Sequence, residues 1–219
     1  MKLAITILRL ITLYLLLSVA TILMLNTVLQ YVSFKDNVGF LQYKQAYLHI
    51  GIWKLAFYTH VFSSILTLAA GFTQFMPSIL QENKKLHRLI GRIYAWDILL
   101  INFPAGFIMA IYANGMLPSK IAFVVLDYLW AWFTLKAILA AKKGNIQLHK
   151  EFMIRSYALT LSAITLRTWK VVLGNTLVPD PELLYKIDAW LGFVPNILLA
   201  EWYIRNNRKN KFTGKKQSV

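Results

Sequence analysis

Six long apolar stretches dominate this chain, and each is long enough to cross a lipid bilayer as a helix, which takes about 20 residues. Hydrophobic residues make up 58% of the 219, and only short loops and a polar tail lie outside the stretches, a composition that excludes an ordinary soluble domain. The sequence therefore predicts an all-α, polytopic membrane protein, a bundle of six transmembrane helices. The predicted crossings are residues 5–31, 55–80, 88–113, 118–141, 150–174 and 186–204.

The first stretch resembles a secretion signal in position but not in length. It is longer than the apolar core of a cleaved signal peptide, and it contains Arg9. We therefore expect it to be retained. The expected organisation is a first helix with an outer interfacial segment, a four-helix functional core, and a last helix with a basic cytoplasmic tail, at 1–54, 55–176 and 177–219.

Basic residues predict the orientation. Of the 24 Lys and Arg residues, 17 fall at one set of predicted helix ends, and six crossings put those ends on one side. The positive-inside rule makes that side, and both termini, cytoplasmic. Topology and anionic lipid headgroups account for the net charge of +15, so we expect no nucleic-acid partner. The chain has no cysteine, which excludes disulfides and thiolate metal sites.

Two predicted helices carry a stripe of small and polar residues at helical spacing, which places each stripe on one helix face. Such stripes let membrane helices pack closely. The longer polar side chains also fit a second interpretation, a polar pathway between the second and fifth crossings. The candidate pathway residues are His60, Ser64, Thr67, Gln74, Thr160 and Arg167, together with Asp97 and Asp127.

Four charged residues lie within predicted crossings, where each costs about 2.5 to 3.5 kcal/mol on insertion scales. Counted from the helix ends, Asp97 and Arg155 fall at one depth, and Asp127 and Arg167 at another. Depth alone therefore predicts two Asp–Arg ion pairs. A structural and a functional role explain such pairs equally well.

Histidines are the candidate ligands. His87 and His149 open the third and fifth crossings at the cytoplasmic edge, whereas His60 lies near the outer end of the second. That separation excludes a zinc site made from all three. It permits a b-type haem held by His87 and His149, if their helices are neighbours. Beside them, Gly91 could admit a porphyrin, and the arginines that could pair with its propionates are Arg88, Arg92 and Arg155. The alternatives are hydrogen-bonded residues at the headgroup level, and proton or quinone chemistry.

Three motifs carry a family resemblance: HVFSSILTLAAGFTQF (60–75), KLHRLIGRIY (85–94) and HKEFMIRSYALTLSAITLR (149–167). They resemble an uncharacterised family of predicted bacterial membrane proteins, domain of unknown function 2306, over about residues 55–175. One departure is Phe72, where many members have proline. The resemblance implies a multi-pass protein of the bacterial inner (cytoplasmic) membrane, and it implies no activity. The positions that match the family pattern are His60, Gln74, Phe75, His87, Arg88, Gly91, Arg92, His149, Met153, Arg155, Ser156, Tyr157 and Arg167.

Our leading hypothesis is a membrane redox protein in which His87 and His149 hold haem b and the polar stripe carries protons or a quinone. The alternative is a cofactor-free transporter or lipid- and solute-binding protein that uses the intramembrane Asp–Arg pairs. A third is a structural subunit of a membrane complex. The expected partners are the bilayer and a quinone or small-molecule ligand.

Overall fold

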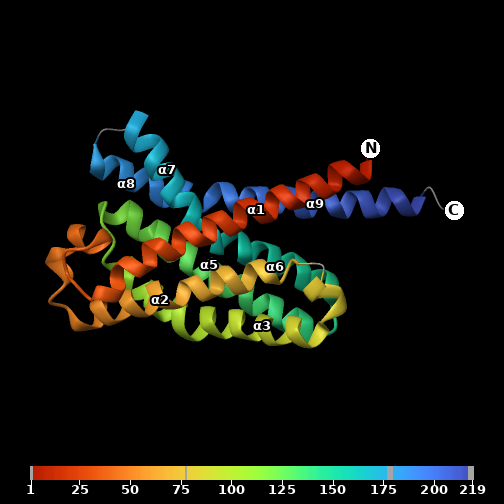
Figure 1. Cartoon of the computed structure of the whole chain (residues 1–219), viewed down its shortest axis with the longest axis horizontal. Helices are drawn as coiled ribbons and strands as arrows, with labels where there is room; N and C mark the ends of the chain where they lie inside the picture. The colour runs from red at the N-terminus through yellow and green to blue at the C-terminus, as the bar shows by residue number, and fades with distance from the viewer. Residues whose placement is uncertain (1, 77, 177–179, 217–219) are drawn as a thin grey trace. The chain divides into compact units, whose positions relative to one another are not determined.

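The computed structural model describes residues 2–76, 78–176 and 180–216, and every regular element among them is helical (Figure 1). The chain divides into two compact units, Met1–Asp97 and Ile98–Val219. The division falls inside one long helical stretch, Lys84–Ile111, which corresponds to the predicted third crossing. Each unit is described by itself.

The first unit contains α1 (Lys2–Leu29), α2 (Gly51–Thr73) and α3 (Lys84–Trp96), and α2 packs against both of the others. Two contacts set the direction of α1. The Tyr14 hydroxyl donates a hydrogen bond to the Phe75 carbonyl, 3.2 Å away. At the other end, the Tyr31 ring packs edge-on against Phe57. Helices α1 and α2 are therefore antiparallel, and Tyr14, near the middle of α1, lies beside the carboxyl end of α2.

Short 3-10 turns at Gln30–Ser33, Gly39–Tyr43 and Gln45–Tyr47 connect α1 to α2. Their aromatic residues complete a small core in which Trp53 and Phe57 are fully buried and stack at 5.5 Å. Lys44, only 2% exposed, places its ammonium group 4.9 Å from the Tyr47 ring, a cation–π contact. The outer interfacial segment is therefore packed against the start of α2.

Helix geometry changes twice near α3. A π-helical turn, Ser78–Glu82, precedes it, and a π-helix, Asp97–Asn102, follows it before α4 (Phe103–Ile111). Pro104 lies in the first turn of α4 and has no N–H to donate to the carbonyl four residues before it. The wider π turn takes up this interruption. Pro104 is therefore accommodated by a local change of helix type.

The second unit is organised around α5 (Met116–Lys142), which packs against α4, α6 and α8. Helix α6 also contacts α9, and α7 pairs with α8 (Figure 1). The bounds of the remaining helices are Ile146–Thr160 for α6, Ser162–Thr176 for α7, Pro181–Leu191 for α8 and Val194–Lys216 for α9.

Five helical stretches of the described residues are long and apolar enough to cross a membrane, whereas we predicted six crossings. The protein is therefore an all-helical membrane protein, and the predicted count and cytoplasmic termini are not confirmed. The five are Tyr14–Ser33, Gly51–Thr73, Lys84–Ile111, Met116–Lys142 and Pro181–Lys209.

The difference lies at the predicted crossing 150–174, which is divided at Leu161 into α6 and α7, each only 15 residues long. Hydroxyl groups surround this division. Thr160 donates to the Ser156 carbonyl, and Thr165 donates to the Leu161 carbonyl. Ser and Thr side chains that bond to the preceding turn bend helices. An average hydropathy over residues 150–174 therefore does not reveal the division at Leu161.

Candidate functional site

Both candidate ligand histidines follow the same local sequence, Asn-x-x-Leu-His. Asn83 caps α3 by accepting a hydrogen bond from the Leu86 amide at 2.9 Å. Asn145 caps α6 in the same way, with the Leu148 amide at 3.0 Å. In both cases the histidine amide then makes the first helical hydrogen bond to the asparagine carbonyl, at 2.9 Å. Each unit therefore fixes one histidine in the first turn of a capped helix.

His149 has a defined tautomer. Its Nδ1 lies 3.0 Å from the carbonyl oxygen of Ala137 in α5. A carbonyl can only accept a hydrogen bond, so Nδ1 carries the proton and the neutral ring has its lone pair on Nε2. This bond to a backbone carbonyl is the arrangement that orients histidine ligands in metal sites.

Gly91 lies one turn after His87 on α3, and its missing side chain accommodates Gln74. A Cβ at Gly91 would lie 2.9 Å from Gln74 Oε1. Gln74 is only 6% exposed, and its Nε2 has no hydrogen-bond partner in the described part of the chain. The space that we predicted for a porphyrin edge is therefore occupied by an amide side chain. His87 itself is half-buried.

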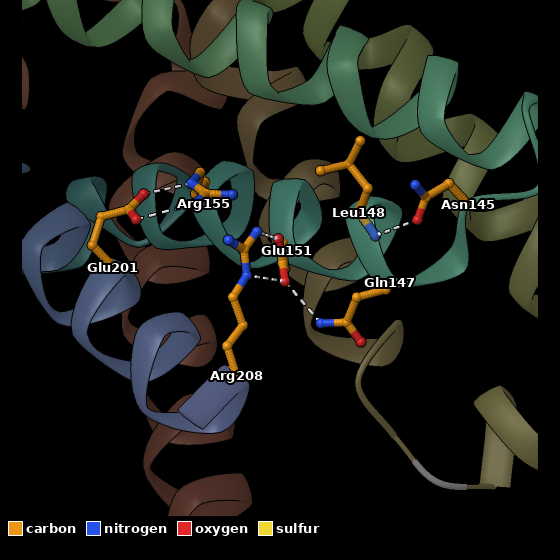
Figure 2. A network of polar contacts seen from close by, with 7 residues as sticks. All are labelled: Asn145, Gln147, Leu148, Glu151, Arg155, Glu201 and Arg208. Carbon is orange, nitrogen blue, oxygen red and sulfur yellow. Dashed lines mark hydrogen bonds and ion pairs between the residues drawn. The ribbon is translucent and has the colours of Figure 1, made fainter. Parts of the chain in front are cut away.

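Two ion pairs join α6 to α9 (Figure 2). Arg155 donates from Nε and Nη2 to the two carboxylate oxygens of Glu201, and Arg208 donates in the same two-point manner to Glu151. Gln147 adds a third donor to Glu151, at 2.8 Å. Because Arg155 meets Glu201 and Glu151 meets the later Arg208, the two helices are antiparallel.

These contacts differ from the Asp–Arg pairs that we predicted. Arg155 pairs with Glu201, not with Asp97. Arg167 is exposed and donates to the Ala163 carbonyl of its own helix, at 2.7 Å. Matching residues by depth failed because it ignored which helices are neighbours.

The exposed Arg88 and Arg92 likewise bond within α3. Arg88 donates to the Lys84 carbonyl and Arg92 donates to the Arg88 carbonyl. The guanidinium groups of both residues thus lie along the exposed surface of α3.

The polar stripe of α6 packs against α5. The Trp130 indole donates to the Thr160 hydroxyl at 3.0 Å, and the hydroxyls of Ser156 and Thr134 lie 2.7 Å apart. All four side chains are buried. In this helix the stripe therefore makes interhelical hydrogen bonds.

In α2 the hydroxyl groups bond to their own helix. Ser64 donates to the Val61 carbonyl, and Thr67 donates to the Ser64 carbonyl. His60, near the start of this stripe, is half-buried. A polar pathway that also involves α6 and α7 stays a prediction.

Three carboxyl groups, those of Asp97, Asp127 and Asp188, lie buried without an ion-pair partner among the described residues. Asp97 is 5% exposed, and the Ser63 hydroxyl lies near it without reaching hydrogen-bond geometry. Asp127 is 6% exposed and faces Gly106, where a Cβ would lie 2.7 Å from Asp127 Oδ1. Within residues 2–76, 78–176 and 180–216, no three His, Cys, Asp or Glu side chains form a group that could hold a metal ion.

Three kinds of group in the candidate site were not predicted from the sequence: the helix caps, the ion-pair residue Glu151 and the backbone acceptor for His149. The caps, Asn83 and Asn145, were readable as asparagines just before an apolar periodic run. Glu151 lies four residues before Arg155, a spacing that puts opposite charges on one helix face. The Ala137 carbonyl gave no signal, because every residue has one.

The helices, their length and their apolar surfaces define a multi-pass α-helical membrane protein. The chain belongs to the family described as "Predicted membrane protein (DUF2306)", whose model matches residues 57–204. The match extends beyond the 55–175 that we expected, because it includes α8 and the first part of α9. No curated protein and no solved structure matches the chain.

Proposed function

We propose that this protein is a redox protein of the bacterial inner membrane, and that His149 and His87 are its candidate ligands for b-type haem. The observation that carries the proposal is the bond from His149 Nδ1 to the Ala137 carbonyl, 3.0 Å long. It leaves the Nε2 lone pair for a metal and holds the ring in one orientation. Imidazole nitrogen is a common donor to haem iron.

The matching caps support His87, in the first unit, as a further candidate ligand. Asn83 and Asn145 set the start of α3 and α6 in the same way, so each histidine occupies the same position relative to its helix end. A bound haem would supply one-electron transfer, with a quinone as the proposed partner. Arg155 is already engaged by Glu201, so Arg88 is the arginine that we assign to a propionate. An edge of the ring at Gly91 requires the Gln74 amide to move aside.

The proposed topology has six crossings and both termini in the cytoplasm. In the first unit, the Tyr14–Phe75 contact makes α1 run antiparallel to α2, so the amino end of α1 points to the side on which the segment leading to Lys84 and Lys85 begins. In the second, the Glu151–Arg208 pair puts the carboxyl end of α9 beside the start of α6. Both are basic ends, which the positive-inside rule assigns to the cytoplasm. Helices α6 and α7 together then make the fifth crossing.

An absorbance spectrum of detergent-purified protein, with whole-protein metal analysis, tests the proposal. We expect a Soret band that is lost in His149→Ala and in His87→Ala. The matched control is His49→Ala, because His49 is exposed in the loop before α2 and should leave the spectrum unchanged. A colourless preparation that elutes as a folded, monodisperse protein after expression with added haem precursor would overturn the haem assignment.

A further inference from the structure

We propose that Asp127 and Asn102 form a proton-binding site between α4 and α5, in which Asp127 is a neutral carboxylic acid that hydrogen-bonds to the Asn102 amide. The proposal is independent of the haem assignment, because it uses neither His87 nor His149. Both residues lie in the second unit and inside candidate membrane-spanning helices.

The burial of Asp127 is the first observation. Its side chain is only 6% exposed, and Oδ2 has no hydrogen-bond partner in the described part of the chain. A charged carboxylate that is enclosed without a donor is far less stable than the protonated form. Asp in a transmembrane helix is therefore a functional candidate that needs an explanation.

The second observation is an unpartnered amide on the helix that packs against α5. Asn102 is 0% exposed, and neither its Nδ2 nor its Oδ1 has a partner among the described residues. It lies four residues before Gly106, hence on the same helix face, and Gly106 is the residue that touches Asp127. A carboxylic acid and a primary amide are complementary, since each has one donor and one acceptor to offer the other.

The backbone around Asn102 allows α4 and α5 to approach each other closely. The π-helix Asp97–Asn102 ends at this residue, and π-helical turns are frequent at functional sites. Gly106 has no side chain, and an alanine there would collide with the Asp127 carboxyl at 2.7 Å. Asp127 therefore fits directly against the α4 backbone, one helical turn from Asn102.

Charged groups on the neighbouring elements do not neutralise Asp127. Helix α4 has no ionisable residue. The ionisable residues of α8 are Glu182, Tyr185, Lys186 and Asp188; Lys186 pairs with Glu182, and the charge that acts on Asp188 is Lys170.

In α6, Glu151 and Arg155 pair with α9, and His149 bonds to Ala137. The remaining α6 groups, Lys150 and Tyr157, make no ion pair or hydrogen bond with Asp127.

A hydrophobic carbodiimide, dicyclohexylcarbodiimide, tests for the protonated acid. The carboxyl proton moves to a carbodiimide nitrogen and the carboxylate oxygen adds to the central carbon; the adduct rearranges to a stable N-acylurea without a leaving group. We expect peptide mass spectrometry of the purified full chain at neutral pH to find this adduct on Asp127 and not in Asp127→Asn. The matched control is Asp36, which is exposed and paired with Lys54 at 2.7 Å and should not react. An unmodified Asp127 in folded protein, or equal modification of Asp36, would overturn the proposal.

Infrared spectroscopy tests the role of Asn102 without relying on reactivity. The wild type should show the carbonyl stretch of a protonated carboxylic acid, and the difference spectrum between the wild type and Asp127→Asn should isolate the Asp127 band. In Asn102→Leu it should persist but move to higher frequency, because the acid loses its amide partner. An unchanged Asp127 band in Asn102→Leu would refute the pairing, and a difference spectrum without a carbonyl band would refute the assignment to Asp127. His149→Ala should keep both the adduct and the band, which separates this site from the haem proposal.

Discussion

Arg155 of α6 and Glu201 of α9 form a two-point ion pair, with Nε 2.5 Å and Nη2 3.0 Å from the two carboxylate oxygens. The Arg155 side chain is 13% exposed and that of Glu201 is 32% exposed, so the pair is partly shielded from solvent. Bidentate geometry adds directional specificity to charge attraction. Together with Glu151 and Arg208, the pair fixes α9 antiparallel to α6.

Removing either partner of this pair should destabilise the protein. We expect Arg155→Ala or Glu201→Ala to cost about 1.5 to 3 kcal/mol, since each leaves a charged hydrogen-bonding group unpaired. The double variant should cost less than the sum of the singles. Reversible unfolding of the detergent-solubilised protein, analysed as a double-mutant cycle, measures this coupling.

The exposed pair Lys186–Glu182 is the matched control, because the Glu182 side chain is 56% exposed. Its double-mutant cycle should give a coupling free energy of about 0 to 1 kcal/mol. Strictly additive effects of Arg155→Ala and Glu201→Ala would show that this pair does not couple α6 to α9.

The buried hydroxyl pair between α5 and α6 should be sensitive to which partner is removed. Thr134 donates its only hydroxyl proton to the Trp130 carbonyl, so Ser156 is the donor in the 2.7 Å contact. Ser156→Ala should cost about 0.6 kcal/mol, the average for a hydrogen bond between membrane helices. Thr134→Val should cost more, because it replaces the hydroxyl in contact with Ser156 by a methyl group that cannot form a hydrogen bond.

The double variant Thr134→Val with Ser156→Ala should be close to neutral, because no buried donor is left unpaired. Thermal unfolding in detergent gives the comparison. Thr168→Val is the control, since Thr168 is exposed and bonds only to its own helix. A double variant that is less stable than Thr134→Val alone would contradict this account.

Much of the fold could be predicted from the sequence, because a bilayer imposes length and apolarity on any helix that crosses it. The interruption at Leu161 could not, because no proline or glycine lies between His149 and Leu173 to mark it. The crossing 150–174 therefore seemed continuous.

The candidate site was less predictable, because the sequence does not give helix neighbours. Depth matched Arg155 with Asp97, and the acidic residue of the adjacent helix, Glu201, was not among the candidates considered. The position of His149 at a helix start was readable from Asn145. Its tautomer depends on the Ala137 carbonyl, which only coordinates reveal.

Cysteine labelling can test the topology, because the chain has no cysteine of its own. We expect a membrane-impermeant maleimide to label Asn37→Cys in intact cells. Lys85→Cys, Lys143→Cys and Lys209→Cys should be labelled only after permeabilisation, since the topology that we propose places their basic surroundings in the cytoplasm. All four positions are exposed. Labelling of Lys209→Cys alongside protection of Lys143→Cys would mean an odd number of crossings after α5.

Alanine at two helix-contact glycines should have unequal effects. At Gly106 a Cβ would lie 2.7 Å from Asp127 Oδ1 and 3.3 Å from its Cγ. Asp127 is short and buried, so α4 and α5 must separate, and overpacking of this kind costs about 1 to 3 kcal/mol. At Gly91 the close atom is the end of Gln74, whose Cδ is 3.7 Å away, and a longer side chain can turn aside.

We therefore expect Gly106→Ala to lower the midpoint of thermal unfolding and Gly91→Ala to lower it less, because alanine also gains about 1 kcal/mol over glycine in a helix interior. Gly51→Ala is the control, since a Cβ there would meet nothing within 4 Å. Truncation of the opposing side chain should relieve the clash, so Gly106→Ala combined with Asp127→Ala should lose less stability than the sum of the two. Additive losses would place the strain elsewhere than in the contact between α4 and α5.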